Sequence, residues 1–263
     1  MKVFIKYINN LITTTTQRLG RSQKMSYKTF TVGANAKTIK GDNDTYETAI
    51  TYMKPYKTEV KGKVYNLCAL ADKAKCHVGC LYTAGRGQMN SVQQSRSNKT
   101  EWFIVDKIGY IDALINDLTK FSQKCERKGI TPCVRLNGTS DIQWEKMGIM
   151  EQFPNIQFYD YTKIVKRVYS KLPSNYHLTL SYSEADASYA DSVLQAVKDT
   201  STSMAVVFRS KHSIPKTFKG LRVVNGDKDD LRFLDPKGVV IALYAKGKAI
   251  KDESGFVIDA MPL

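Results

Sequence analysis

The sequence predicts an α/β fold in which mostly parallel strands form a full or partial (β/α) barrel. Apolar strand-like runs alternate with segments of helical period, and this alternation implies βαβ crossovers and a parallel sheet. Polar residues follow six of these runs, as they do on the active face of parallel-barrel enzymes. These polar ends are Asn137 with Asp141, Asp160 with Lys163, Ser181 with Glu184, Arg209 with Lys211, Asn225 with Asp227, and Lys246. An open doubly wound sheet is the alternative, because the pattern does not show closure.

The first predicted elements place a cysteine-bearing loop after an early strand. Residues 29–33 resemble a short strand that enters a Gly/Asn/Lys loop, and the apolar run 64–70 delivers Cys68. Residues 91–129 have helical period, with Gly129 as the C-cap. The apolar face of that helix is predicted to consist of Ile108, Ile111, Leu114, Ile115, Leu118 and Phe121.

The rest of the chain repeats a plan of strand followed by helix. The predicted helices cover 142–153, 164–172 and 186–200, and the predicted strands lie within 131–141, 156–163, 176–184, 204–210, 221–230 and 238–248. With 263 residues, 42% of them hydrophobic, the chain can bury a full core as one large domain or two small ones. We expect a single α/β domain of catalytic type over residues 26–263.

Residues 1–25 contain no Asp or Glu and carry several Lys and Arg residues. A basic, hydroxyl-rich leader of this kind can be a targeting peptide. Its apolar part is short for a secretory signal, so we predict a disordered extension, placed before a true start at Met25.

The net charge of +15 and the pI near 9.5 favour a polyanionic partner, most simply nucleic acid. Basic charge also serves solubility, which is the alternative interpretation. No apolar run approaches the roughly 20 residues that cross a bilayer, so we expect no membrane association. Composition leaves the oligomeric state open.

Three cysteines, Cys68, Cys76 and Cys80, follow the early strand with the spacing Cys-x7-Cys-x3-Cys. The total of five cysteines is odd and no secretory signal precedes them, so we expect reduced thiols rather than a disulfide framework. Three thiolates leave one coordination position open, as a catalytic iron–sulfur cluster or a catalytic zinc requires. His77 as a fourth ligand would close a zinc site and make it structural. Ordinary burial as small hydrophobes is the alternative, and we expect it for the other two cysteines.

Basic and aromatic residues are candidates for binding phosphate or nucleic acid. Arg86 lies between Gly85 and Gly87, which allow close approach of the backbone while the guanidinium donates to phosphate. An ordinary glycine turn with a solvated arginine is the alternative. The further candidates are the cations Lys99, Arg135 and Lys163, and Tyr82 for stacking on bases.

Carboxylates at two strand ends are candidates for catalysis. Asp141 and Asp160 follow strongly apolar strands and are predicted as acid–base groups or nucleophiles, with Asn137 beside them. Aspartate after a strand is also a good helix N-cap, and this is the alternative for Asp141.

Several separated blocks carry a family resemblance. They are NAKTIKG, CHVGCLYTAGRG followed by NSVQQSRSNKTEWF, VRLNGTSDIQWE, QFYDYTK, NYHLTLSYSE and DLRFLDPKGV. Together they resemble the bacteriophage family catalogued as gene product eighty-eight, from about Ser26 to the C-terminus. The resemblance implies a phage source, the cytoplasm of the infected host cell as the place of action, and an extension before Met25.

Two weaker likenesses suggest chemistry. A three-cysteine loop after an early barrel strand is similar to radical S-adenosylmethionine enzymes, whose thiolates hold a four-iron cluster that binds this cofactor. Their usual spacing, Cys-x3-Cys-x2-Cys, differs from the spacing here. A basic barrel with strand-end aspartates is similar to the transglycosylases that exchange guanine for a 7-deazaguanine, although their zinc ligands lie late in the chain and include a histidine.

These observations predict a phage metal-dependent enzyme that modifies a nucleobase or nucleotide in nucleic acid; DNA is favoured over RNA, and the sequence leaves this choice open. The alternative is a non-enzymatic nucleic-acid-binding protein in which zinc only staples the loop.

Overall fold

The structure is a computed structural model that describes residues 29–33, 39, 44–80, 82 and 84–259. The predicted extension 1–25 lies outside these ranges, as does most of the Gly/Asn/Lys loop predicted after residue 33.

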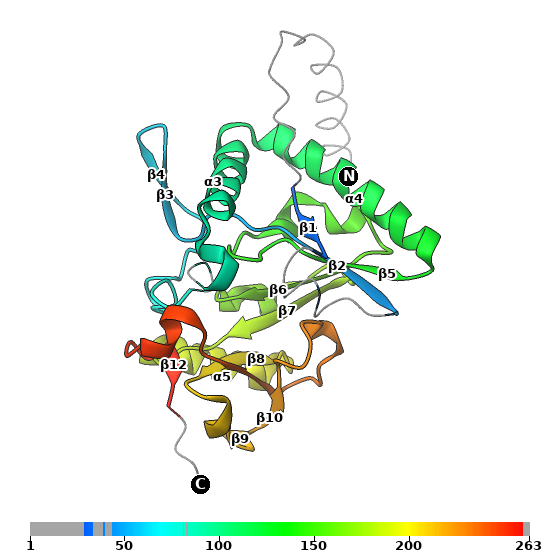
Figure 1. Cartoon of the computed structure of the whole chain (residues 1–263). Helices are drawn as coiled ribbons and strands as arrows, with labels where there is room; N and C mark the ends of the chain where they lie inside the picture. The colour runs from blue at the N-terminus through cyan, green and yellow to red at the C-terminus, as the bar shows by residue number, and fades with distance from the viewer. Residues whose placement is uncertain (1–28, 34–38, 40–43, 81, 83, 260–263) are drawn as a thin grey trace, which may run out of the picture.

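A largely parallel sheet forms the centre of the described part of the chain (Figure 1). Its ten strands follow the order β1-β2-β5-β6-β7-β8-β11-β10-β9, and β12 pairs with β8. The strands are β1 (Thr31–Val32), β2 (Tyr46–Ile50), β5 (Thr131–Arg135), β6 (Gln157–Thr162), β7 (Tyr176–Ser181), β8 (Met204–Phe208), β9 (Thr217–Phe218), β10 (Leu221–Asn225), β11 (Val240–Tyr244) and β12 (Val257–Ile258). The predicted α/β class with mostly parallel strands is therefore confirmed.

No closed barrel is found among the described strands. β2 pairs with antiparallel β1 at one end of the order, and β10 pairs with antiparallel β9 at the other. Each outer parallel strand thus has a short antiparallel strand at its outer edge, and the full or partial barrel stays a prediction.

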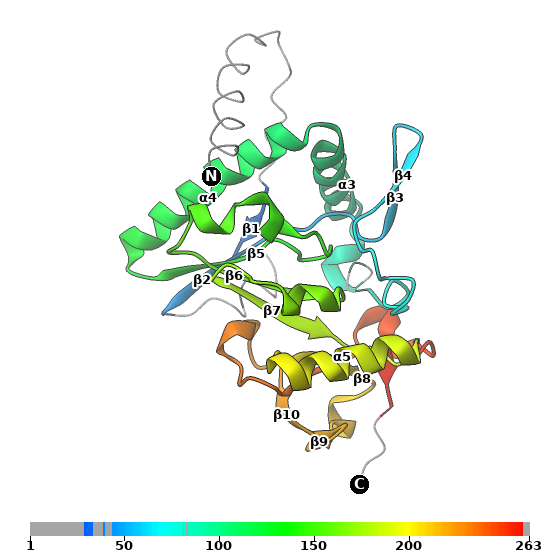
Figure 2. The same cartoon turned by 180° about the vertical axis from the view of Figure 1, so that it is seen from behind.

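The strand register sorts the side chains onto two faces. Paired residues such as Val134 with Phe158, or Leu180 with Met204, point to the same face because side chains alternate along a strand. The first pair packs in the same core cluster as residues of α4 (Lys107–Lys128), and the second in the cluster of α5 (Ala187–Thr200). The helices therefore share one face of the sheet, α4 near β2 and β5, and α5 near β8 (Figures 1 and 2).

The predicted helix 91–129 is two helices, α3 (Asn90–Val105) and α4. Asp106 breaks it: its carboxylate accepts a hydrogen bond from Gly109 N at 3.0 Å and caps α4. Gly129 ends α4 in the left-handed conformation, with φ of 67°, as predicted. The buried stripe of α4 consists of Tyr110, Leu114, Leu118, Phe121 and Cys125, whereas Ile108 of the predicted face is exposed.

Two other predicted helices are short 3₁₀ turns. Residues 142–153 form η3 (Trp144–Met147) and η4 (Met150–Gln152), because Gly148 interrupts them with φ of 66°. Residues 164–172 form only η5 (Val165–Tyr169). The predicted helix at 186–200 is confirmed as α5. No helix among the described residues is both long and apolar enough to cross a membrane.

The early strand before the cysteines does not belong to the parallel sheet. β3 (Lys57–Val60) and β4 (Lys63–Asn66) form a separate antiparallel hairpin. Lys61 and Gly62 at its turn have φ of 50° and 74°, as a two-residue hairpin turn requires. The cysteine-bearing loop thus leaves a hairpin that stands apart from the sheet (Figure 1).

The cap at Asp106 supports a stability prediction. Asp106→Ala should lower the free energy of unfolding by about 1 kcal/mol, because the first turn of α4 loses its acceptor. Urea denaturation measures this loss. Asp106→Asn keeps an acceptor and is the control; equal losses in both variants would contradict the capping role.

Candidate functional site

The cysteine-bearing loop, residues 67–80, lies across the carboxyl ends of parallel strands. Near its start, Leu67 O accepts a backbone hydrogen bond at 2.8 Å from Asp141 N, beyond β5. Further along, Ala74 O accepts a hydrogen bond at 2.8 Å from Ser183 Oγ, just beyond β7. Ligands of open α/β sheets bind at this edge, so the loop covers the part of the fold where a site is expected.

The segment before β12 completes the same edge. One side of β8 pairs first with β7, through Met204 and Ala205, and then with β12, through Val207 and Phe208. η8 (Gly247–Lys251) precedes β12 and packs against the loop so closely that a Cβ on Gly79 would lie 3.0 Å from the Cβ of Ala249.

The three thiols of the loop are partly exposed and influence one another. Burial raises the pKa of Cys68 to about 12, Cys76 and Cys80 add to this increase, and Lys163 opposes it. Burial also raises the pKa of Cys80. Cys68 Sγ lies 3.6 Å from the carbonyl oxygen of Thr139. The loop therefore holds neighbouring thiols of which at least Cys68 is protonated at neutral pH.

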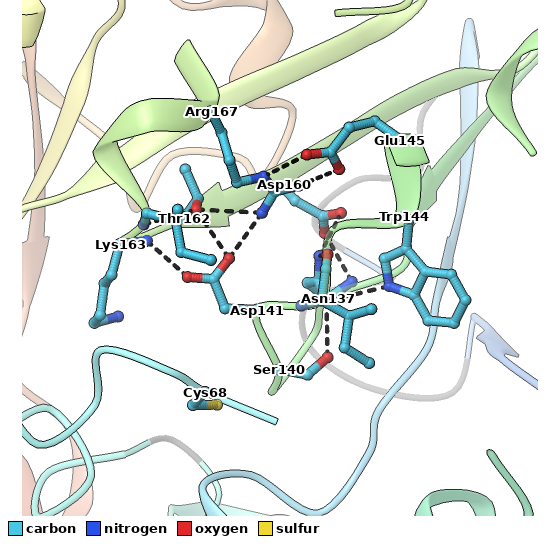
Figure 3. Close-up of polar contacts among 12 residues, drawn as sticks. Cys68, Asn137, Ser140, Asp141, Trp144, Glu145, Asp160, Thr162, Lys163 and Arg167 are labelled. Atoms are coloured by element: carbon cyan, nitrogen blue, oxygen red, sulfur yellow. Dashed lines mark hydrogen bonds and ion pairs between the residues drawn. The ribbon is translucent and has the colours of Figure 1, made fainter. Parts of the chain in front are cut away.

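Lys163 supplies positive charge to this group of thiols. It follows β6 directly, and its side chain extends toward the segment that carries Cys68 (Figure 3). Burial lowers the pKa of Lys163, and nearby groups including Cys76, Tyr189 and Asp141 raise it. The second effect is larger, so the pKa of Lys163 lies above its usual value. Within the described ranges, its ammonium makes no ion pair with a carboxylate inside 4.0 Å.

His77, the predicted fourth ligand, has other contacts. Its ring stacks on Tyr56 with 4.6 Å between centroids, and its Nδ1 lies 3.0 Å from Ala71 O. In the part of the chain that the structure describes, no three Cys, His, Asp or Glu side chains are arranged to hold a metal ion. A metal bound by the thiols would therefore require them to turn toward a common point.

The predicted catalytic residue Asp160 is 1% exposed and lies on the helix-covered face of β6. Its carboxylate accepts hydrogen bonds from Asn137 N at 2.8 Å, Asn137 Nδ2 at 3.2 Å and Tyr176 OH at 2.9 Å. Burial raises its pKa to about 6, although Arg135 and Asn137 act in the opposite direction.

Asn137 organises the turn that follows β5. Its Oδ1 accepts hydrogen bonds from Ser140 Oγ at 2.9 Å, Ile142 N at 2.9 Å and Trp144 Nε1 at 3.2 Å (Figure 3). One side-chain amide thus bonds to Asp160 through its nitrogen and to the turn through its oxygen.

Asp141 ties the ends of β5 and β6 together. Its carboxylate accepts from Thr162 Oγ1 at 2.9 Å, Lys163 N at 2.8 Å and Arg167 Nη1 at 2.8 Å. Arg167 also holds both oxygens of Glu145 (Figure 3). The structure thus brings Asn137, Asp141 and Asp160 together, and the hydrogen bonds of each hold strand ends and turns in place.

The predicted phosphate-binding residues are separated by the sheet. Arg86 is exposed in η2 (Gly85–Gln88), and Lys99 is buried on α3. Arg135 is 2% exposed, faces the opposite side of the sheet, and pairs with Asp230 at 2.6 Å. Arg135 therefore has an internal partner, whereas Arg86, Lys99, Lys163 and Tyr82 belong to the segments around the thiol loop.

A family model described as Gene product 88 matches residues 25–260 of the chain. This chain belongs to the Gene product 88 family. The match begins at Met25 and includes the cysteine loop and every predicted site residue, so the resemblance to this phage family is confirmed. No curated protein and no solved structure matches the chain.

Sequence reasoning missed Arg96 in this Gene product 88 chain. Its guanidinium carbon lies 5.2 Å from the Tyr52 ring centroid and 5.3 Å from that of Tyr82, and Cys80 is near enough to affect its pKa. The available signal was the spacing of Arg96 and Lys99, which places two cations on one face of a helix. Burial lowers the pKa of both residues.

The raised pKa of Asp160 makes stability depend on pH. A carboxyl with a pKa of 3.8 when unfolded and about 6 when folded binds more protons in the folded state between those values. Its contribution is therefore present at acid pH and falls as pH rises through that window. Relative to Asp160→Asn, the wild-type free energy of unfolding should decrease by about 2 kcal/mol from pH 4 to pH 6.

Denaturant titrations across this pH range measure the difference between the two proteins, which cancels the contribution of other titrating groups. Asp191→Asn, at an exposed position of α5, is the control and should leave the profile unchanged. A wild-type minus Asp160→Asn difference that stays constant from pH 4 to pH 6 would rule out the raised pKa.

Proposed function

We propose that this protein is a metal-dependent enzyme that modifies a nucleobase or nucleotide of nucleic acid, with Cys68, Cys76 and Cys80 as its metal ligands. One observation carries the proposal. Three thiols of one loop lie within electrostatic reach of one another and of Lys163, at the carboxyl edge of a parallel sheet.

The donor set suits a zinc ion or an iron–sulfur cluster, since both bind thiolates. His77 is engaged with Tyr56 and Ala71, so the loop offers three ligands and leaves one coordination position for substrate or cofactor. Structural zinc sites use four protein ligands, and an open position is the mark of a catalytic centre.

Charge at the site supports the same proposal. Three thiolates around a divalent ion carry a net negative charge, and Lys163 supplies a nearby positive charge. Because the pKa of Cys68 is about 12 without a metal, binding would release protons, and metal affinity would increase with pH.

The substrate class follows from the charge of the whole protein and from the cations of this edge. The net charge of +15 favours a polyanion, and Arg86 and Lys163 lie on segments at or next to the thiol loop. In this proposal Asp141, Asp160 and Asn137 position the strand ends beneath the site.

A second candidate, a zinc-stapled nucleic-acid-binding protein, is favoured by one observation. Asp160 is buried and the side chain of Asp141 is 9% exposed, and each carboxylate accepts three hydrogen bonds from groups of the fold, as expected of carboxylates with a structural role. Mass spectrometry of DNA incubated with the metal-loaded protein distinguishes the two candidates. A modified base supports the enzyme, and DNA binding without a product supports the binding protein with a structural zinc ion.

We predict that protein purified without oxygen contains either zinc or iron with sulfide, and that Cys76→Ala loses most of it. Elemental analysis with an optical spectrum measures this. Cys133→Ala removes a thiol of the core, away from the loop, and should keep the metal content of the wild type. Iron with visible absorbance would indicate an iron–sulfur cluster. Zinc without colour would indicate either an enzyme that exchanges a base or a binding protein with a structural zinc ion. Metal-free protein, or equal loss in both variants, would overturn the proposal.

A further inference from the structure

We propose that Arg96 and Lys99 of α3 form a binding site for a phosphate group beside the thiol loop. This inference goes beyond the proposed function, because the site is built from two cations and needs no metal. The ligand class is a phosphate mono- or diester, supplied either by a free nucleotide or by the backbone of a nucleic acid.

The inward face of α3 is unusual for a helix that packs on a core. Its buried residues are Arg96, Lys99, Thr100 and Phe103. A helix normally turns an apolar stripe inward and its charges toward water. Here Arg96 is 7% exposed and Lys99 is 4% exposed, so both cations of the helix are buried.

Neither cation has an acidic partner in the described part of the chain. Arg96 Nε and Nη1 are buried and make no hydrogen bond. Among the described residues, Lys99 Nζ donates only to Ser95 Oγ, at 3.3 Å. The rings of Tyr52 and Tyr82 lie near the guanidinium of Arg96 and attract its charge.

The other buried arginines among the described residues have the carboxylate partners that Arg96 lacks there. Each pairs with carboxylates: Arg135 with Asp230, Arg167 with Asp141 and Glu145, and Arg232 with Asp229 and Asp235. A buried charge without a partner strongly destabilises a fold, and a bound anion would supply the partner that the described residues do not give Arg96.

The two cations suit phosphate in particular. A guanidinium offers a fork of N–H donors that matches phosphate oxygens, and an ammonium adds a point charge. Lys99 follows Arg96 by three residues, which places both on one helix face. Gln93 of the same helix donates to Tyr82 O and Gly87 O, and so holds the glycine turn with exposed Arg86 next to this face.

Binding can be tested with inorganic phosphate, AMP and an eight-residue oligothymidylate without terminal phosphate, at constant ionic strength. Calorimetric titration and thermal melting are measured for the wild type, Arg96→Met and Lys99→Met. Either substitution should weaken binding about 10- to 100-fold, the cost of a lost charge-assisted hydrogen bond. Lys120→Met, at an exposed position of α4, is the matched control and should bind as the wild type does.

Melting without ligand separates a binding role from a structural one. Arg96→Met removes an unpaired buried charge, so its melting temperature should equal or exceed that of the wild type. Arg96→Lys keeps the charge without the fork and should bind with intermediate affinity. A wild type that binds none of the three probes, variants that bind as well as the wild type, or a Lys120→Met that loses as much affinity would overturn the site.

The two sources of phosphate give different results. Binding of AMP but not of the oligothymidylate assigns the site to free nucleotides, and binding of the oligothymidylate assigns it to a nucleic-acid backbone. Metal content is measured on the same preparations. Arg96→Met should lose phosphate binding and keep the metal content of the wild type. This result would show that the phosphate site is distinct from the thiol site, which Cys76→Ala tests.

Discussion

The buried carboxylate of Asp160 is the interaction on which the carboxyl edge of the sheet depends. It binds the backbone and side chain of Asn137 at the end of β5 and the hydroxyl of Tyr176 at the start of β7. Asn137 in turn holds the turn that carries Asp141, and Asp141 holds the end of β6. The same turn anchors the beginning of the cysteine loop through Leu67. The loop thus rests on strand ends that share one continuous hydrogen-bond network.

Buried cations in this molecule differ in whether they pair with carboxylates. Where an arginine lies inside the fold with carboxylates around it, as Arg167 does, its hydrogen bonds fix the geometry of neighbouring turns. Arg96 and Lys99 lie inside without such a partner among the described residues, and an unpaired buried charge is a cost that packing does not explain. Natural sequences retain such costs mainly at functional positions.

The sequence allowed the parallel strands and α5 to be predicted, because their apolar periodicity is strong. The division of the long helix at Asp106 and the 3₁₀ turns around Gly148 were not predicted, since each depends on one residue that competes with an otherwise helical pattern. Periodicity also could not show that the strand before Cys68 belongs to a hairpin, because hydrogen-bond partners are set by tertiary pairing. Asn137, Asp141 and Asp160 were predicted as neighbours, but their mutual bonds follow from register. Arg96 was missed because a charged residue on a polar helix is ordinarily solvated.

The shared edge of β8 has a consequence for biosynthesis. β7 and β12 divide one side of the same strand, and η8, next to β12, packs against Gly79 of the cysteine loop. The ribosome makes the thiols long before it makes residues 247–258. Until that segment emerges, the nascent loop lacks the packing that η8 provides at Gly79, so this end of the loop is more exposed than in the complete fold.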